Sequence, residues 1–381
     1  MNDNNTIEAK TTTYHDDLSS TRTKIQHSIL MCVTFAGSIF LMQTHQHWIW
    51  KFLPFIPYKS DFKTNIGIFR ATFTLFVFYG LHALLSSPLM SFMRNPVRLM
   101  LHKRFFYVKV VLLMLLHYIL SDLPLAILSW FATLCFLIGF TYMLVQVLLV
   151  IELGHKWSEA YIQDNRRESL ITIMVLTIVF NVVSVIIFIY EYILFTGQDC
   201  TFNSTLIATT VLTCVLITIL SYPDIIKEQS SLFQCSVVTL YCAYLSFDAM
   251  LGHPDDQCNA MAGRTSVTHV VLSCVFIILS LMHACYGLEE PSPTGGFDGE
   301  EEQEELDSFF TFNLLIMMCC TYMSMICTGW SSIETDNSGA DFALGYDFGR
   351  SWKAVYIKTL FLAITPIGYL YTCIKSKHDD E

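Results

Sequence analysis

Charged residues are scarce in this sequence. Asp, Glu, Lys and Arg together make up 14% of the 381 residues, whereas 53% are hydrophobic. A chain of this composition cannot cover a soluble core with a charged surface, and its mean hydropathy of +0.49 agrees with that conclusion. The composition therefore indicates an integral membrane protein.

Known catalytic motifs are missing as well. The sequence contains no nucleophile elbow, no phosphate-binding glycine loop and no paired-histidine helix. Its 13 cysteines are too scattered for a zinc framework, and the pair His45 and His47 has no third ligand nearby. We therefore expect no enzyme: no catalytic residue, no metal site and no enzymatic cofactor.

Long apolar runs, in contrast, are abundant. About ten of them are long enough to cross a bilayer, and a helical bundle satisfies the backbone there. We therefore predict an all-α polytopic membrane protein with a transmembrane domain over residues 25–374. The runs are 25–42, 66–89, 105–120, 124–151, 170–195, 206–222, 232–251, 267–288, 309–330 and 352–374.

An even number of spans puts both chain ends on the same side of the membrane. Basic residues are concentrated on that side, for example in the segment 94–104, and basic loops are retained in the cytosol. We therefore expect cytosolic tails over residues 1–24 and 375–381. The acidic stretch 289–307 has no Lys or Arg and is expected to be a disordered cytosolic loop.

Two cysteines outside the apolar runs, Cys200 and Cys258, fall on the opposite, lumenal side. Disulfides persist in that compartment, so we predict a bridge between them. The triplet Asn203-Ser204-Thr205 is an acceptor for N-glycosylation in the same region, close to the membrane.

The longest apolar stretch lies between Pro124 and Gln163. It carries no charge before Glu152, and at 1.5 Å per residue a helix here must tilt or project beyond the bilayer core. Glu152 either finds a partner within the membrane or reaches the interface. Aromatic residues at helix ends are typical of the headgroup region. The predicted interface anchors are Trp157, Tyr161, Trp330 and Trp352.

The run 232–251 is the most polar of the predicted spans. Such a helix faces protein or a wet groove rather than lipid tails, and interhelical hydrogen bonding alone would also explain it. We expect this span and the long helix to line a lipid groove. The candidate groove residues are Gln234, Ser236, Thr239, Tyr241, Tyr244, Ser246 and Asp248 in the span and Gln146 in the long helix.

Four charged residues fall inside or at the ends of predicted spans: Arg70, Lys109, Glu152 and Lys358. Lys109 and Glu152 are both placed near cytosolic helix ends, so we hypothesise that they form an ion pair. Removing one partner of such a pair would leave a buried charge.

Several phrases of the sequence resemble one family. The segments LVQVLLVIELGHKWSEAYI at 144–162 and SLFQCSVVTLYCAYLSFDAMLGHPDDQCN at 231–259 are similar to the two hallmark segments of the serine incorporator proteins. The resemblance implies ten transmembrane helices in two sub-bundles, crossed by a long oblique helix that here corresponds to about 124–163. Two positions depart from the family pattern: Glu152 stands where an Asp is usual, and Tyr161 where a Trp is expected.

The resemblance also implies a function in lipid handling. Family members bind phospholipid in grooves, are named for incorporating serine into phosphatidylserine and sphingolipids, and in some cases scramble phospholipids without ATP. We therefore expect bound phospholipid or sphingolipid, membrane lipids as partners, no nucleic acid, and a plasma-membrane or endomembrane location. A homo-oligomer or a membrane-complex partner is a further expectation.

Two other functions fit the same sequence. A secondary carrier for serine or another small polar solute would need helices broken near the bilayer midplane, and Gly80, Gly139 and Pro366 are the candidate breaks. A non-transporting structural subunit of a membrane assembly would use the polar positions for packing alone.

Overall fold

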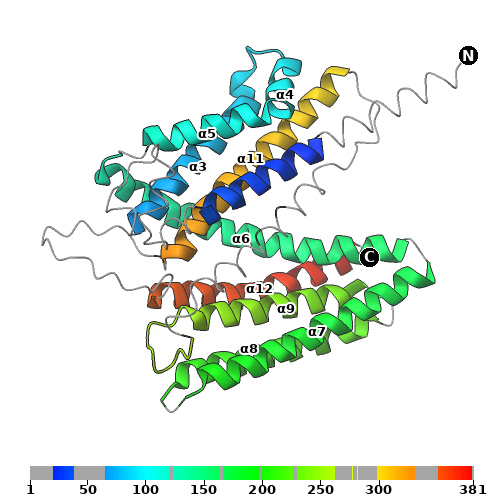
Figure 1. Cartoon of the computed structure of the whole chain (residues 1–381). Helices are drawn as coiled ribbons and strands as arrows, with labels where there is room; N and C mark the ends of the chain where they lie inside the picture. Colours follow the sequence, from blue (N-terminus) through cyan, green and yellow to red (C-terminus); the bar gives the residue numbers. More distant parts are fainter. Residues whose placement is uncertain are drawn as a thin grey trace, which may run out of the picture. The chain divides into compact units, whose positions relative to one another are not determined.

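The computed structural model describes the transmembrane helices and several of the turns between them. The described residues are 20–37, 65–120, 123–163, 166–197, 199–225, 230–261, 277, 281, 298–328, 330 and 351–379. Within these ranges the secondary structure is helical and contains no strand (Figure 1). The candidate metal ligands His45 and His47 lie outside the described residues.

The helices fit the predicted fold class, an all-α polytopic membrane protein. Seven of them are long and apolar enough to cross a membrane, and α5 is a shorter apolar helix. Residues 20–37 form a helix over part of the first predicted span, whereas the run 267–288 falls almost wholly outside the described residues. The long elements are α3 (Asn65–Ser86), α5 (Phe106–Leu120), α6 (Leu125–Gln163), α7 (Arg167–Phe195), α8 (Thr201–Ile225), α9 (Ser230–Leu251), α11 (Asp298–Thr328) and α12 (Trp352–Asp379).

The chain divides into two compact units, and the division falls inside α6. Unit 1 comprises residues 1–142, 274–325 and 332–344, and unit 2 comprises 143–273, 326–331 and 345–381. Helix α6 is continuous over 39 residues. At 1.5 Å per residue it is roughly 58 Å long, about twice the thickness of a bilayer core.

In unit 1, α3 is joined to α5 by a short 3₁₀ helix, η2 (Pro88–Met90), and by α4 (Asn95–Lys103). Leu99 of α4 packs with Leu306 and Phe309 of α11 in a buried cluster. Helix α11 begins at Asp298, so residues 298–307 are its first turns. The prediction that the acidic stretch is disordered up to residue 307 is therefore wrong for these ten positions.

In unit 2, α7, α8 and α12 pack around α9. Of the residues in the most apolar part of α9, 78% are buried, compared with 17% for α7 and 33% for α8. The unit 2 part of α6 approaches α9 closely at Gly154, where an added Cβ would lie 3.3 Å from the Cα of Gln234. The most polar span is therefore the central helix of this unit, and the apolar helices face outward.

Candidate functional site

The seven groove candidates in α9 are all buried within unit 2. Their exposed fractions run from 0% at Ser246 to 8% at Gln234. This confirms the prediction that the helix faces protein rather than lipid tails. The residues concerned are Gln234, Ser236, Thr239, Tyr241, Tyr244, Ser246 and Asp248.

An ion pair joins α9 to α12. The Lys358 Nζ lies 2.9 Å from the Asp248 Oδ2 and also donates a hydrogen bond of 3.1 Å to the Asp248 carbonyl. Both side chains are only 1% exposed. Lys358 was predicted as a buried charge, and its partner is a residue predicted only as a groove candidate.

A second buried acid, Glu191, joins α7 to α9. The Ser246 hydroxyl donates to the Glu191 Oε2 over 3.1 Å, and Glu191 is 0% exposed. The Glu191 Oε1 has no hydrogen-bond partner among the residues that the structure describes. Glu191 was not among the predicted site residues, although a single acid within the run 170–195 is a signal that could have identified it.

Helix α6 contributes one hydrogen bond and one buried amide to this interior. The Gln234 amide of α9 donates to the Ile151 carbonyl of α6 over 3.3 Å. Gln146 is completely buried, and neither atom of its side-chain amide has a hydrogen-bond partner within the described ranges. The Thr239 hydroxyl is likewise buried. The interior of unit 2 thus holds polar atoms that its own side chains leave unsatisfied.

Lys109 and Glu152, which were hypothesised to form an ion pair, each have partners within their own unit. The Lys109 Nζ donates to the His102 carbonyl over 2.5 Å and lies 3.2 Å from the His27 Nε2. Glu152 pairs with Lys156 one helical turn along α6 at 3.2 Å, and its side chain is 49% exposed. Lys109 is buried as predicted, whereas Glu152 is the residue that reaches the surface.

Arg70 is buried in α3, at 4% exposure, which confirms its prediction as a buried charge.

The predicted interface anchors differ from one another in exposure. Trp157 and Trp352 are each 42% exposed, and Tyr161 is half-buried. Trp330, however, is only 2% exposed, so the structure contradicts its role as an anchor at the surface of the chain.

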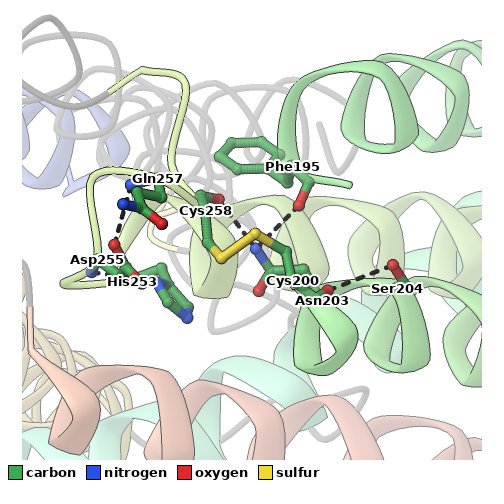
Figure 2. The surroundings of a disulfide bond; sticks show 8 residues. All are labelled: Phe195, Cys200, Asn203, Ser204, His253, Asp255, Gln257 and Cys258. Atoms are coloured by element: carbon green, nitrogen blue, oxygen red, sulfur yellow. Dashed lines mark hydrogen bonds between the residues drawn. A yellow bond between two sulfur atoms is a disulfide. The ribbon is translucent and has the colours of Figure 1, made fainter. Parts of the chain in front are cut away.

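The disulfide between Cys200 and Cys258 is present, as predicted. Figure 2 shows that Asn203 lies beside it in the first turn of α8. The Asn203 Nδ2 donates to the Phe195 carbonyl over 3.2 Å and to the Cys258 carbonyl over 3.0 Å, and the residue is 1% exposed. The nitrogen that would carry a glycan is therefore engaged inside the fold, which argues against the predicted glycosylation.

A buried basic cluster lies in unit 1 where α3 ends and α4 begins. Arg98 donates to the carbonyls of Leu85, Ser86 and Ser87 over 2.9, 2.6 and 2.7 Å, respectively. His102 is 1% exposed, and its Nε2 lies 2.7 Å from the Ser86 hydroxyl. Burial is the main reason why the pKa of His102 is well below 6.5, and repulsion by nearby cationic groups lowers the pKa further.

The family model for the serine incorporators (Serinc) matches residues 6–308 of this chain. This chain belongs to the serine incorporator family. A probable serine incorporator of Nematostella vectensis is 21% identical over 93% of this chain and 90% of its own length. A membrane protein of Schizosaccharomyces pombe is 22% identical over 81% and 77%, and serine incorporator 3 of Bos taurus is 30% identical over 54% and 45%.

The two segments that resemble the serine incorporator hallmarks meet in unit 2. Residues 144–162 lie in α6, and 231–259 cover α9 and the turn that carries Cys258. Gly154 of the first segment contacts Gln234 of the second, and Gln234 donates to Ile151. These two segments therefore form one packing interface, between α6 and α9.

Proposed function

We propose that this protein binds phospholipid and allows lipid headgroups to cross the bilayer along the polar side of α9. The observation that carries the proposal is a membrane helix whose seven polar groove candidates are all buried behind apolar neighbours. Membership of the serine incorporator family supports a role among membrane lipids. No nucleotide or ion gradient is needed for such passive movement.

The barrier to headgroup movement explains why a polar helix matters. A headgroup carried through hydrocarbon loses its hydrogen bonds, at a cost of several kcal/mol. Buried amide and carboxyl groups such as Gln146 and Glu191 offer replacement partners, because they hold polar atoms without a hydrogen bond within the described structure. In the resting arrangement these groups are enclosed, so a neighbouring helix must separate from α9 for a headgroup to enter.

We further propose that the lipids include those whose headgroup derives from serine, phosphatidylserine and sphingolipids, and that the protein supports their synthesis without being an enzyme itself. The relatives' name, serine incorporator, motivates this choice. Bound phospholipid or sphingolipid is the proposed ligand, in the plasma membrane or an endomembrane, with both termini in the cytosol. A homo-oligomer or a membrane-complex partner is part of the same proposal.

The test is dithionite quenching of fluorescent phospholipid in proteoliposomes. Quenching well beyond the outer-leaflet half is expected for the wild type. Thr239→Val removes a buried hydroxyl from α9 and keeps the shape of the side chain, so it should slow lipid crossing without unfolding the protein. Thr172→Val, on the exposed face of α7, is the matched control and should leave the rate unchanged. Quenching that stops at half with folded wild-type protein would refute the proposal.

A carrier for serine or another small polar solute is the second candidate. The unsatisfied atoms of Glu191 and Gln146 favour it, because a solute could supply their missing partners. The proposed helix breaks do not favour it, because Gly80, Gly139 and Pro366 all lie inside continuous helices. Uptake of labelled serine that is lost in Glu191→Gln would support the carrier. A stable stoichiometric complex with neither activity would instead support a structural subunit.

A further inference from the structure

The segment that joins α3 to α5 in unit 1 exposes large apolar side chains in a connecting turn. Leu89 and Phe92 are each 78% exposed, and Val97 and Met100 on one face of α4 are 41% and 39% exposed. Arg94 and Arg104 are exposed beside them. Large apolar side chains exposed beside exposed cationic side chains are unusual in a turn that contacts only water.

Two independent features indicate the depth of this segment in a bilayer. First, α4 is attached to the end of a membrane span, because Arg98 donates to the carbonyls of Leu85, Ser86 and Ser87. Arg98 is 1% exposed, so α4 cannot turn away without breaking these hydrogen bonds.

Second, α4 packs against the point at which α11 changes from acidic to apolar. Lys103 pairs with Glu305 at 2.7 Å, Leu99 packs on Leu306 and Phe309, and His102 stacks on Phe309 at 5.1 Å. Apart from Asp307, the remaining acidic residues of α11 begin with Asp298 and lie further toward its N-terminal end. Both features place α4 at the boundary between hydrocarbon and water.

We infer that residues 88–104 form an interfacial anchor that inserts its apolar side chains into the bilayer surface and binds anionic lipid headgroups. Leu89, Phe92, Val97 and Met100 supply the apolar part. Arg94 and Arg104 supply the charge, whereas Lys103 is already paired with Glu305 and Arg98 with carbonyls. Short amphipathic helices with cationic residues bind anionic membrane surfaces in this way.

The inference commits to a lipid surface for three reasons. The segment is continuous with α3 and α5, whose exposed apolar faces lie in the membrane. Its exposed cationic side chains, Arg94 and Arg104, complement anionic headgroups. The α11 acid that contacts α4, Glu305, is paired with Lys103 and leaves Arg94 and Arg104 exposed. The anchor does not depend on lipid transit, so a protein inactive in the dithionite assay can still possess it.

A photoreactive residue at Phe92 tests the apolar part. The variant Phe92→benzoylphenylalanine replaces an exposed ring, so the fold should tolerate it. In nanodiscs of mixed phosphatidylcholine and phosphatidylglycerol, illumination should yield lipid adducts, as it should at Leu115 in the exposed face of α5. The same residue at Glu304, in the acidic turns, should yield none. A covalent dimer of the chain, or a result like that at Glu304, would overturn the anchor.

The composition of the lipid adducts tests the charged part. Phosphatidylglycerol should be enriched at position 92 above its share of the bilayer, by about fivefold for each neighbouring cation. Arg94→Gln with Arg104→Gln should remove this enrichment, whereas Arg94→Lys with Arg104→Lys should retain it. Adducts that follow the bulk lipid ratio in the wild type would overturn the anionic preference.

Discussion

Two of the buried cations of unit 1, Arg98 and Lys109, bind backbone carbonyls, whereas in unit 2 the buried cation Lys358 binds the carboxylate of Asp248. The carbonyls in unit 1 belong to helix ends: Arg98 binds the end of α3, and Lys109 binds His102 in the last turn of α4. Within the part of the chain that the structure describes, no carboxylate contacts Arg98 or Lys109.

The difference shows that a helix C-terminus can replace an acid as the partner of a buried cation. The terminal carbonyls lack intrahelical donors and carry the negative end of the helix dipole, so they stabilise a positive charge. Carbonyls cost less to leave unpaired than a carboxylate does, because they carry no net charge. Loss of the cation should therefore be more damaging in unit 2 than in unit 1.

The largest effect is expected for Lys358→Met, which leaves Asp248 as an uncompensated buried charge. We expect a loss of about 3–5 kcal/mol of stability, measured by thermal or denaturant unfolding in detergent. The double variant Lys358→Met with Asp248→Leu removes both charges and should recover most of that loss. A single variant as stable as the wild type would show that the pair contributes nothing.

The next largest effect concerns the disulfide, which fixes one end of unit 2. Cys200→Ser with Cys258→Ser should cost about 2–4 kcal/mol, because the reduced chain gains freedom in the unfolded state. Cys32→Ser, which removes a free thiol from unit 1, is the control and should change little. Equal unfolding temperatures with and without reductant would contradict this prediction.

In unit 1, Arg98→Lys keeps the charge but loses the guanidinium fork. An ammonium group cannot reach three carbonyls and the Asn95 side chain together, so we expect a loss of about 1.5–3 kcal/mol. Arg94→Lys, on the exposed side of the same turn, should be neutral. If Arg98→Lys and Arg94→Lys change the free energy of unfolding equally, the carbonyl partners of Arg98 do not determine stability.

A smaller, pH-dependent effect is expected from His102. Its pKa is lowered in the folded protein, so the neutral form is favoured and its contribution is complete above the ordinary value of 6.5. Stability should therefore fall as the pH decreases below about 6.5, and His102→Gln should weaken this dependence in a pH series of unfolding temperatures. His155→Gln, at an exposed position in unit 2, should leave the dependence intact.

No change at all is expected when the protein is treated with an N-glycosidase. The Asn203 amide is buried and donates to two carbonyls beside the disulfide, so the triplet should carry no glycan. Unchanged electrophoretic mobility of protein made in a eukaryotic host would agree with this. A mobility shift that Asn203→Gln abolishes would show that a glycan is attached before unit 2 closes.

The sequence predicted the spans that the structure describes, and the disulfide, well, because apolar length and loop position are local properties of a chain. It placed Lys109 and Glu152 at similar depths, but depth does not say in which direction a side chain leaves its helix. That direction is set by packing, which turns Glu152 outward and Lys109 toward His102. Trp330 was wrongly predicted as an anchor for the same reason.

The start of α11 was missed for a different reason. A run of glutamates without basic residues resembles a disordered acidic loop. Glu is nevertheless a good helix former, and acids near a helix N-terminus are favoured by the dipole, so the apolar helix extends outward through them. The hydrogen bonds of Arg98 were not predicted either, because a basic residue in a loop is usually solvated rather than bound to the end of a helix.

The disulfide has a consequence for the biosynthesis of the protein. Cys200 precedes α8 and Cys258 follows α9, so the translocation machinery must complete a whole helical hairpin before the two thiols can meet. They oxidise only if that hairpin enters in the orientation that delivers both to an oxidising compartment. A molecule that carries the bond has therefore inserted α8 and α9 so that both thiols reached an oxidising compartment.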